Sequence, residues 1–348
     1  MHKTPFVSFI IAVASLTAFS THAQDTSTAP DGAVRPVTVD NFARAETDTY
    51  FAAKAKQVGL GKMLYQRTLV PIENQLVIRS NRDTLYSSGV FDLDAGPVTI
   101  TLPDSGTRYM SLQLTNEDHY VPHVFYGAGS YVLTKENIGT RYVLAQVRIL
   151  VDPNKPADVQ AVHALQDKIA VNQKSVGALE LPTWDPVSQK KVRDALQTLS
   201  TTVSYFNKAF GTKAEVDPIQ HLIGTAAGWG GIPGKDAVYL NITPPKNDGQ
   251  TFYRLRIKEV PVNAFWSVSV YNAEGFFQKN PQNAYTLNNL TAKKSADGSI
   301  TMQFGDCDRK VDNCLPIVAG WNYTVRLYRP QAEILDGSWH FPSPEPIN

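Results

Sequence analysis

Hydrophobic and polar residues alternate at period two in two separate stretches of the chain, as expected for strands with one buried face. The first stretch runs from Val77 to Val151 and contains VTITL at 98, RYMSLQLTN at 108, SYVLT at 130 and RYVLAQVRILV at 141. The second begins at Phe252 and contains FYRLRI, AFWSVSVYN, SITMQF and NYTVRLYRP. We therefore predict a mainly β protein with two antiparallel β-sandwich domains of jelly-roll-like form.

Two other segments have the character of helices. The segment VDNFARAETDTYFAAKAKQVGLGKMLYQ lacks Pro, and Asp40 is its predicted N-cap, so we expect one or two N-terminal helices. From Pro156 to about Ala214, apolar residues recur at three- and four-residue spacing, and Gly211 is a natural stop. This pattern predicts a helical insert between the two β domains. The stretch GTAAGWGGIPGKDAVYLNI after it fits no G-x-G-x-x-G register, and we interpret it as irregular.

The patterns divide the chain into five parts. These are a signal peptide at 1–23, a flexible segment at 24–39, a helix plus β-sandwich domain at 40–155, a helical or irregular insert at 156–235, and a C-terminal β-sandwich domain at 236–348. The two β domains also share a sequence echo, since RYMSLQLTNEDHY at 108 resembles AFWSVSVYNAEGF at 264. The echo aligns Tyr109 with Phe265, Ser111 with Ser267 and Asn116 with Asn272, and it places Tyr142 and Arg148 beside Tyr323 and Arg326.

The N-terminal segment has the three parts of a secretory signal. His2 and Lys3 precede an apolar run from Phe6 to about Phe19, and Thr21-His22-Ala23 forms a small-x-small cleavage pattern. The run is shorter than the roughly 20 residues of a transmembrane helix. We expect cleavage after Ala23, a periplasmic or secreted protein, and no membrane span after cleavage.

The charge composition argues against nucleic acid as a binding partner of this protein. Lys and Arg number 33 against 32 Asp and Glu, and a net charge of +1 provides no field to attract nucleic acid. We expect a small-molecule ligand and no nucleic acid; a homo-oligomer stays open, and the sequence names no cofactor. The chain has two cysteines, Cys307 and Cys314, and export to an oxidising compartment predicts a disulfide between them.

The run VIRSNRDTLYSSGVFDLD at 77–94 is the first candidate site. In an extended strand its polar side chains would lie on both faces, which is unusual inside a sandwich. In one interpretation Asp83 pairs with Arg82 or Arg108 in a buried structural network. In the other the segment binds a carboxylate or phosphate ester. The ligand-binding candidates are Arg79, Asn81, Arg82 and Arg108, and the catalytic candidates here are Asp83 and Tyr86.

The second candidate is NEDHYVPH at 116–123, where Asp118 and His119 could act as general acid or base. Glu117 and His123 add metal-ligand types, but Pro122 disfavours a helix and we predict no metal site. The chain lacks a G-x-S-x-G motif. An enzyme acting on a small polar or carboxylated molecule remains one hypothesis, and a non-catalytic ligand-binding or envelope-associated protein is the alternative. Among the tryptophans, Trp266 and Trp321 fall in strand patterns and are predicted core residues.

Several of these segments together resemble one family. The set VIRSNRDTLYSSGVFDL, GPVTITLPDSGTRYMSLQLTNEDHY, GTRYVLAQVRILVDP, AFWSVSVYN and TVRLYRP is similar to bacterial exported proteins that pair the domain of unknown function 1254 with the domain of unknown function 1214. The resemblance implies β-sandwich domains combined with helical segments, and it implies no particular chemistry. Relatives typically read Asn-Trp-Leu-Pro where this chain has Asn313-Cys314-Leu315-Pro316, so no role of that tryptophan is carried over.

Overall fold

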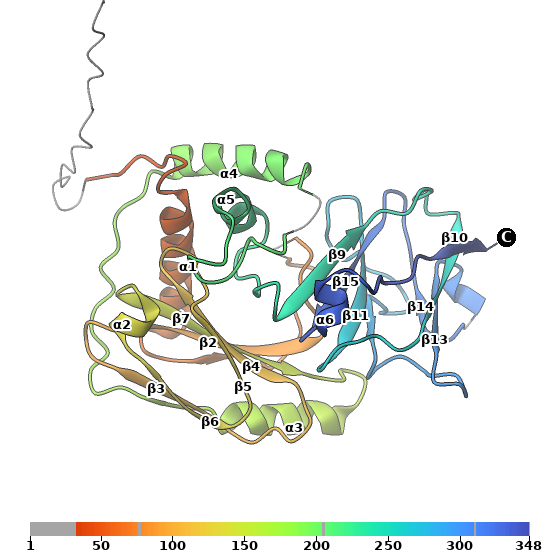
Figure 1. Ribbon diagram of the computed structural model, residues 1–348, viewed down its shortest axis with the longest axis horizontal. Helices are drawn as coiled ribbons and strands as arrows, with labels where there is room; N and C mark the ends of the chain where they lie inside the picture. Colours follow the sequence, from red (N-terminus) through yellow and green to blue (C-terminus); the bar gives the residue numbers. More distant parts are fainter. Residues whose placement is uncertain (1–32, 76–77, 204–205, 310, 348) are drawn as a thin grey trace, which may run out of the picture.

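The protein has a mainly β fold with helices, and its four sheets are divided between two lobes that lie side by side (Figure 1). The computed structural model describes residues 33–75, 78–203, 206–309 and 311–347. The predicted signal peptide and most of the predicted flexible segment lie outside these residues. We call residues 33–235 the N-terminal lobe and residues 236–347 the C-terminal lobe.

The N-terminal lobe contains two antiparallel sheets that share one apolar core. The larger sheet has the order β1 (Leu64–Tyr65), β2 (Thr84–Asp92), β7 (Tyr142–Leu150), β4 (Met110–Asn116) and β5 (His123–Tyr126). The smaller has the order β6 (Gly129–Leu133), β3 (Val98–Leu102) and β8 (Ala170–Asn172). Phe91 and Val147 from the larger sheet and Ile100 from the smaller sheet are fully buried in the shared core.

The C-terminal lobe contains two four-stranded sheets around a second core. One has the order β14 (Cys314–Leu315), β13 (Ile300–Phe304), β10 (Phe252–Ile257) and β16 (Glu345–Ile347). The other has the order β12 (Thr286–Asn288), β11 (Trp266–Tyr271), β15 (Asn322–Tyr328) and β9 (Ala237–Ile242). Strand pairing is antiparallel except between β13 and β14. Trp266 and Trp321 are buried in this core, as predicted.

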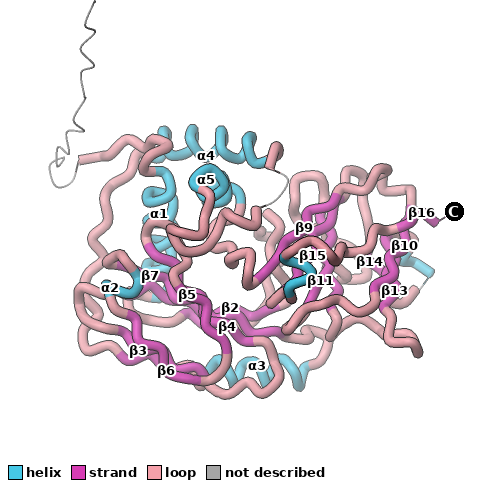
Figure 2. The backbone as a smooth tube through the Cα atoms, viewed as in Figure 1, coloured by secondary structure: helices cyan, strands magenta, loops and turns pink. Residues whose placement is uncertain are grey.

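The longer helices belong to the N-terminal lobe. Helices α1 (Phe42–Val58), α4 (Pro186–Ser200) and α5 (Pro218–Ala227) pack together over one face of the larger sheet, and α3 (Pro156–Asp167) lies on the opposite side (Figure 2). Three shorter elements are α2 (Lys135–Ile138), the single 3₁₀ turn η1 (Cys307–Arg309) and α6 (Ala332–Leu335).

Three helix predictions were wrong in detail. The N-cap of α1 is Asn41 rather than Asp40, because the Asn41 carbonyl accepts the first helical N–H, that of Ala45, at 3.0 Å. The helical pattern after Pro156 is interrupted at Ala170–Asn172, which pairs with β3 instead. Helix α5 begins before, and extends into, the segment interpreted as irregular. Its start follows ordinary capping rules, since the Asp217 carboxylate accepts two backbone N–H groups and Pro218 is the first helical residue.

The sequence echo corresponds to a structural duplication across the two lobes. In the N-terminal lobe, Arg148 of β7 lies between Tyr86 of β2 and Ser111 of β4. In the C-terminal lobe, Arg326 of β15 lies between Tyr239 of β9 and Ser267 of β11. We call each Tyr-Arg-Ser set a rung, and the two rungs are equivalent in register.

The turns that follow β4 and β11, the strands that carry the rung serines, are also duplicated. The Asn116 and Asn272 side-chain oxygens each accept the N–H four residues later, and their backbone oxygens each accept the N–H three residues later. His119 adopts φ +64° where the other turn has Gly275 at φ +86°. The Tyr142 and Tyr323 positions are not equivalent, because they precede their arginines by different numbers of residues. Tyr109 and Phe265 are equivalent as predicted, because their carbonyls accept the N–H groups of Leu150 and Tyr328, each two residues after a rung arginine. The echo therefore holds for these aromatic positions, the rungs and the turns, and not for Tyr142 and Tyr323.

Candidate functional site

The segment 78–83 crosses the C-terminal lobe and is not part of a strand, because β2 begins at Thr84 and Arg79 has φ +50°. The Arg79 N–H donates to the Gly275 carbonyl at 2.7 Å. The Arg326 guanidinium donates to the Arg79 carbonyl at 2.7 Å and to the Ser80 carbonyl at 3.2 Å. The extended strand considered for this run is present from Thr84 onward, and residues 78–83 lie outside it. The polar groups of residues 78–83 join the two lobes.

Asp83 is fully buried, and amide and hydroxyl groups of the other lobe bind it. Its Oδ1 accepts from Asn288 Nδ2 at 3.1 Å and from Thr286 Oγ1 at 3.4 Å. Its Oδ2 has no partner among the described residues. Arg108 instead forms an ion pair with Asp158, and Arg82 donates to the Val70 carbonyl. The predicted pairing of Asp83 with Arg82 or Arg108 was therefore wrong, because neither guanidinium approaches this carboxylate.

Asn81 and Tyr86 lie at the same junction. The Asn81 amide donates to the Tyr328 hydroxyl at 2.9 Å and accepts the Asp83 N–H at 2.6 Å. Tyr86 belongs to the first rung, and its ring lies 5.4 Å from the Arg148 guanidinium carbon. Burial raises the pKa of Tyr328 well above its ordinary value, so this phenol stays neutral at physiological pH. Asn81 and Tyr86 are thus held in a buried polar layer between the lobes.

The two rung arginines bind backbone carbonyls of segments that cross their sheets. Arg148 donates to the Gln113 side chain at 2.7 Å and to the Gly230 carbonyl at 2.9 Å. Arg326 binds Ser269 and the Tyr271 hydroxyl in addition to the crossing carbonyls described above. Both arginines are almost fully buried. Their hydrogen bonds explain how two charges without a carboxylate partner are accommodated.

Asp118 and His119 lie in a different region, beneath α1 and α5. The Asp118 carboxylate accepts from Arg44 at 2.6 Å. His119 is fully buried, and its Nε2 accepts the Gly230 N–H at 2.9 Å, which places the proton on Nδ1 toward Thr225 Oγ1 at 2.8 Å. Burial lowers the pKa of His119 well below its ordinary value. Both ring nitrogens are hydrogen-bonded, and the neutral imidazole binds α5 through Thr225 and the loop after it through Gly230.

A cleft of about 680 Å³ opens at the junction of the lobes. Its walls come from the loop at 67–73, the start of β2, the start of α3 and the loop at 279–285. The charged lining residues are Arg67, Glu73, Arg82 and Lys279, and the apolar ones include Leu69, Ile72, Leu85, Val151 and Val159. Of the residues predicted as site residues, Arg82 alone lines this cleft.

The cations of the cleft differ in their pairing. Arg67 forms an ion pair with Asp167, and Lys279 Nζ lies 3.2 Å from Glu73 Oε1. The Arg82 guanidinium lies 5.2 Å from the centre of the Tyr285 ring and forms no ion pair with any described residue. Burial lowers the pKa of Arg82, but an arginine remains charged at physiological pH. Arg82 is therefore the unpaired cation of the cleft.

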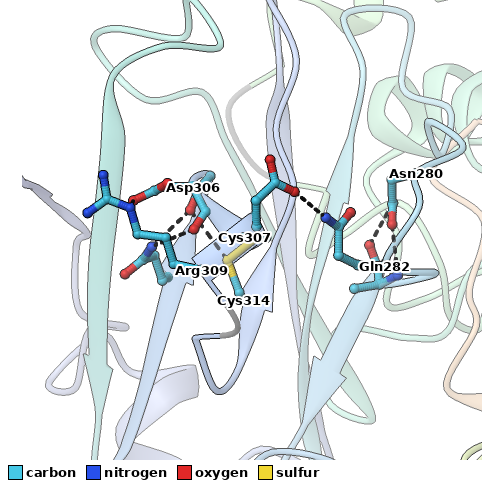
Figure 3. Close-up of a disulfide and its surroundings, with 10 residues drawn as sticks. Asn280, Gln282, Asp306, Cys307, Arg309 and Cys314 are labelled. Carbon is cyan, nitrogen blue, oxygen red and sulfur yellow. Dashed lines mark hydrogen bonds and ion pairs between the residues drawn. A yellow bond between two sulfur atoms is a disulfide. The ribbon is translucent and has the colours of Figure 1, made fainter.

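The predicted disulfide between Cys307 and Cys314 is present, and it supports one wall of the cleft. Figure 3 shows Gln282 of the loop at 279–285 directed toward the disulfide loop. The Gln282 Nε2 donates to Asp308 Oδ1 at 2.8 Å. Asn280 stabilises the same wall by hydrogen bonds with the backbone of Ala284.

Sequence reasoning missed most of this cleft. Arg67, Glu73, Lys279 and Tyr285 lie in loops that carry no motif, and the two walls are separated by about two hundred residues of chain. The sequence did indicate one residue of the cleft, Arg82 in the run Asn81-Arg82-Asp83. Its location in a cleft depends on how the two lobes meet, which no local pattern predicts.

Comparisons with known proteins identify two families in one chain. Residues 60–173 match the family described as protein of unknown function (DUF1254), and residues 243–332 match the family described as protein of unknown function (DUF1214). The two matches occur in the order expected from the resemblance. No curated protein matches the chain.

Two solved structures share the fold. The VPA0106 protein from Vibrio parahaemolyticus is 18% identical, with a TM-score of 0.68 over 89% of this chain and 98% of its own. A putative uncharacterized protein from Burkholderia cenocepacia is 12% identical, with a TM-score of 0.51 over 88% of this chain and 86% of its own. At these identities the likeness extends to the fold alone. Among the described residues, no helix has the length and apolar character of a membrane span.

Proposed function

We propose that this chain, which belongs to the proteins that pair DUF1254 with DUF1214, binds a small carboxylated molecule in the junction cleft. The observation that carries the proposal is Arg82, a partly buried guanidinium without an ion-pair partner among the described residues. Buried charges are normally paired, because desolvation is costly. A ligand carboxylate can accept two parallel N–H groups of an arginine and would compensate this cost.

The contacts of Arg82 support binding at a fixed position. One guanidinium nitrogen donates to the Val70 carbonyl, and the aromatic rings of Phe277 and Tyr285 lie 5.9 and 5.2 Å from the guanidinium carbon. These contacts orient the guanidinium plane before any ligand arrives. Orienting it in advance reduces the entropy that binding costs.

Binding without catalysis is better supported than an enzymatic reaction. Asp118 is in an ion pair with Arg44, and both ring nitrogens of His119 are hydrogen-bonded away from the cleft. Within the described lining of the cleft, the carboxylate is that of Glu73, which pairs with Lys279. A general acid or base must reach the reacting proton within hydrogen-bond distance, and these groups are otherwise engaged.

We also propose that the protein acts after export, in the periplasm or outside the cell. The tripartite N-terminal pattern and the Cys307–Cys314 disulfide support this location. The proposed architecture remains a pair of jelly-roll-like sandwiches, and the two cores, each shared by two sheets, support it.

Isothermal titration calorimetry with a panel of carboxylates tests the binding proposal. Arg82→Gln is expected to weaken binding by tenfold or more, because the amide removes the charge and the paired donors. The matched control is Arg256→Gln, since Arg256 is an exposed arginine paired with Asp297 in the other lobe. Equal affinity in wild type and Arg82→Gln, or an equal loss in both variants, would exclude Arg82 as the anchor.

A further inference from the structure

We infer that the ligand of the junction cleft is an amphiphilic monocarboxylate, with one anionic group and an apolar body of several carbon atoms. This inference rests on the proposed function, because it takes Arg82 as the anchor of the carboxylate. The cleft has a volume of about 680 Å³, which leaves space beyond the guanidinium for more than a carboxylate.

The apolar wall of the cleft is an extension of the N-terminal core. Leu85 and Val151 belong to that core, and Leu69 and Val159 are partly buried side chains packed against it. All four side chains line the cleft, and Leu69 and Val159 keep part of their surface exposed. An apolar chain placed here would be removed from water on this side, which is favourable.

The charge pattern favours one anionic group and disfavours two. Arg67 is neutralised by Asp167 and Lys279 by Glu73, so Arg82 is left as the single unpaired cation of the described lining. Glu73 occupies Lys279, so a second ligand carboxylate would meet an ammonium that already has a partner. A dicarboxylate or a phosphate dianion therefore lacks a second cationic partner in this cleft.

The ring of Tyr285 lies where the carboxylate of such a ligand would join its apolar body. Tyr285 is a buried lining residue from the C-terminal lobe, and its ring is next to the Arg82 guanidinium. The apolar wall comes from the opposite lobe. A ligand with its carboxylate at Arg82 would therefore place its chain between the lobes, against Leu69 and Val159.

Calorimetric titration with butanoate, hexanoate and octanoate, below their self-association concentrations, tests the inference. Affinity is expected to rise by about fourfold for each methylene that becomes buried. Succinate and octan-1-ol are the comparison ligands, because the first has two charges and a short chain and the second has no charge. Both are expected to bind at least tenfold more weakly than octanoate.

Two variants distinguish the contribution of the ligand's acyl chain to affinity from that of its carboxylate. Leu69→Ser is expected to reduce the gain from butanoate to octanoate, whereas Arg82→Gln is expected to weaken all three acids by a similar factor. Val187→Ser is the control, because Val187 is 76% exposed on α4 and does not line the cleft. Thermal unfolding of each variant verifies that it is folded at the titration temperature.

The outcomes distinguish this inference from the proposed function. Arg82-dependent binding without chain-length dependence, or tighter binding of succinate than of octanoate, would overturn the amphiphilic ligand and leave the carboxylate site intact. Binding of no carboxylate, or binding that is unchanged in Arg82→Gln, would overturn both. Chain-length dependence that disappears in Leu69→Ser and persists in Val187→Ser is the supporting result.

Discussion

Individual buried charges in this protein are accommodated in different ways, and Asp48, like Asp83, has one carboxylate oxygen without a hydrogen-bond partner among the described residues. The rung arginines each donate several hydrogen bonds. Asp48 of α1 is 2% exposed and accepts from Trp184 Nε1 at 2.8 Å through Oδ2, while its Oδ1 has no partner among the described residues. Burial, together with the nearby carboxylates of Glu117 and Asp118, raises the pKa of Asp48 to about 7, against the opposing effects of Trp184 and Arg44.

This pKa predicts that the contribution of Asp48 to the free energy of unfolding falls as pH rises from about 4 to about 7, whereas the buried neutral His119 contributes in the opposite sense. The folded protein holds a proton on Asp48 in this range and the unfolded chain does not, so this contribution decreases with pH. Asp48→Asn should remove much of that decrease, because an amide stays neutral and can still accept from Trp184. Urea unfolding at several pH values measures the effect.

The control for Asp48→Asn is Asp40→Asn, a change at an exposed carboxylate beside the same helix. This variant should keep the wild-type pH dependence. If Asp48→Asn has the same slope as wild type between pH 4 and 7, then Asp48 is ionised in the folded protein throughout that range.

At the scale of elements, two walls of the cleft are loops that other elements hold in place. The loop at 279–285 is tied to the disulfide loop through Gln282 and Asp308, and the loop at 67–73 is tied to α3 through Arg67 and Asp167. Neither loop belongs to a sheet. The positions of these two walls therefore depend on a few side-chain contacts outside the two cores.

Replacing both cysteines by serine should test the contribution of the disulfide. The bond closes a short loop, since the cysteines are seven residues apart, and its removal should lower the free energy of unfolding by about 2 kcal/mol. Chemical unfolding measures this change. Ligand affinity should also decrease, because the wall that contains Lys279 and Tyr285 loses a support.

Gln282→Ala is the control for the double serine variant. It removes the hydrogen bond to Asp308 and keeps the disulfide, so it should affect affinity more than stability. Unchanged stability in the double serine variant would show that the disulfide loop is held by its other contacts, such as those of β13 with β14.

At the scale of the whole molecule, the two lobes are joined by a polar and aromatic layer. Tyr109 of the N-terminal lobe packs against Phe265 and Tyr328 of the C-terminal lobe, with ring centres 5.2 and 5.4 Å apart. Phe265 is fully buried and also stacks on Tyr328 at 4.2 Å. The rung arginines and the crossing segments add buried hydrogen bonds to the same layer. The lobes should consequently depend on each other for stability.

Differential scanning calorimetry should therefore detect one cooperative transition in the wild-type protein. Phe265→Ala should lower the free energy of unfolding by about 3 to 5 kcal/mol, because it leaves a cavity at the lobe junction. Trp339→Ala is a comparison within the C-terminal lobe, since Trp339 packs at the edge of that lobe's own core. Two resolved transitions in the wild type would contradict the coupling of the lobes.

The sequence alone determined the elements whose pattern is local. Strands such as Val98–Leu102 and Phe252–Ile257, the buried positions of Trp266 and Trp321, and the disulfide followed from periodicity, composition and cysteine count. The family also followed from short local runs. These features depend on contacts within a strand and its own core, so a few neighbouring residues specify them.

Only the tertiary structure decided where the site lies and which polar groups remain unpaired. The partners of Asp83 are Thr286 and Asn288, some two hundred residues away, and both ring nitrogens of His119 are bound by a distant helix and loop. From the sequence, an ion pair of Asp83 with Arg82 or Arg108 was one of two interpretations, because local spacing could not supply those partners. Arg82 became the candidate anchor for the same reason, since a charge is paired or unpaired according to which segments fold against it.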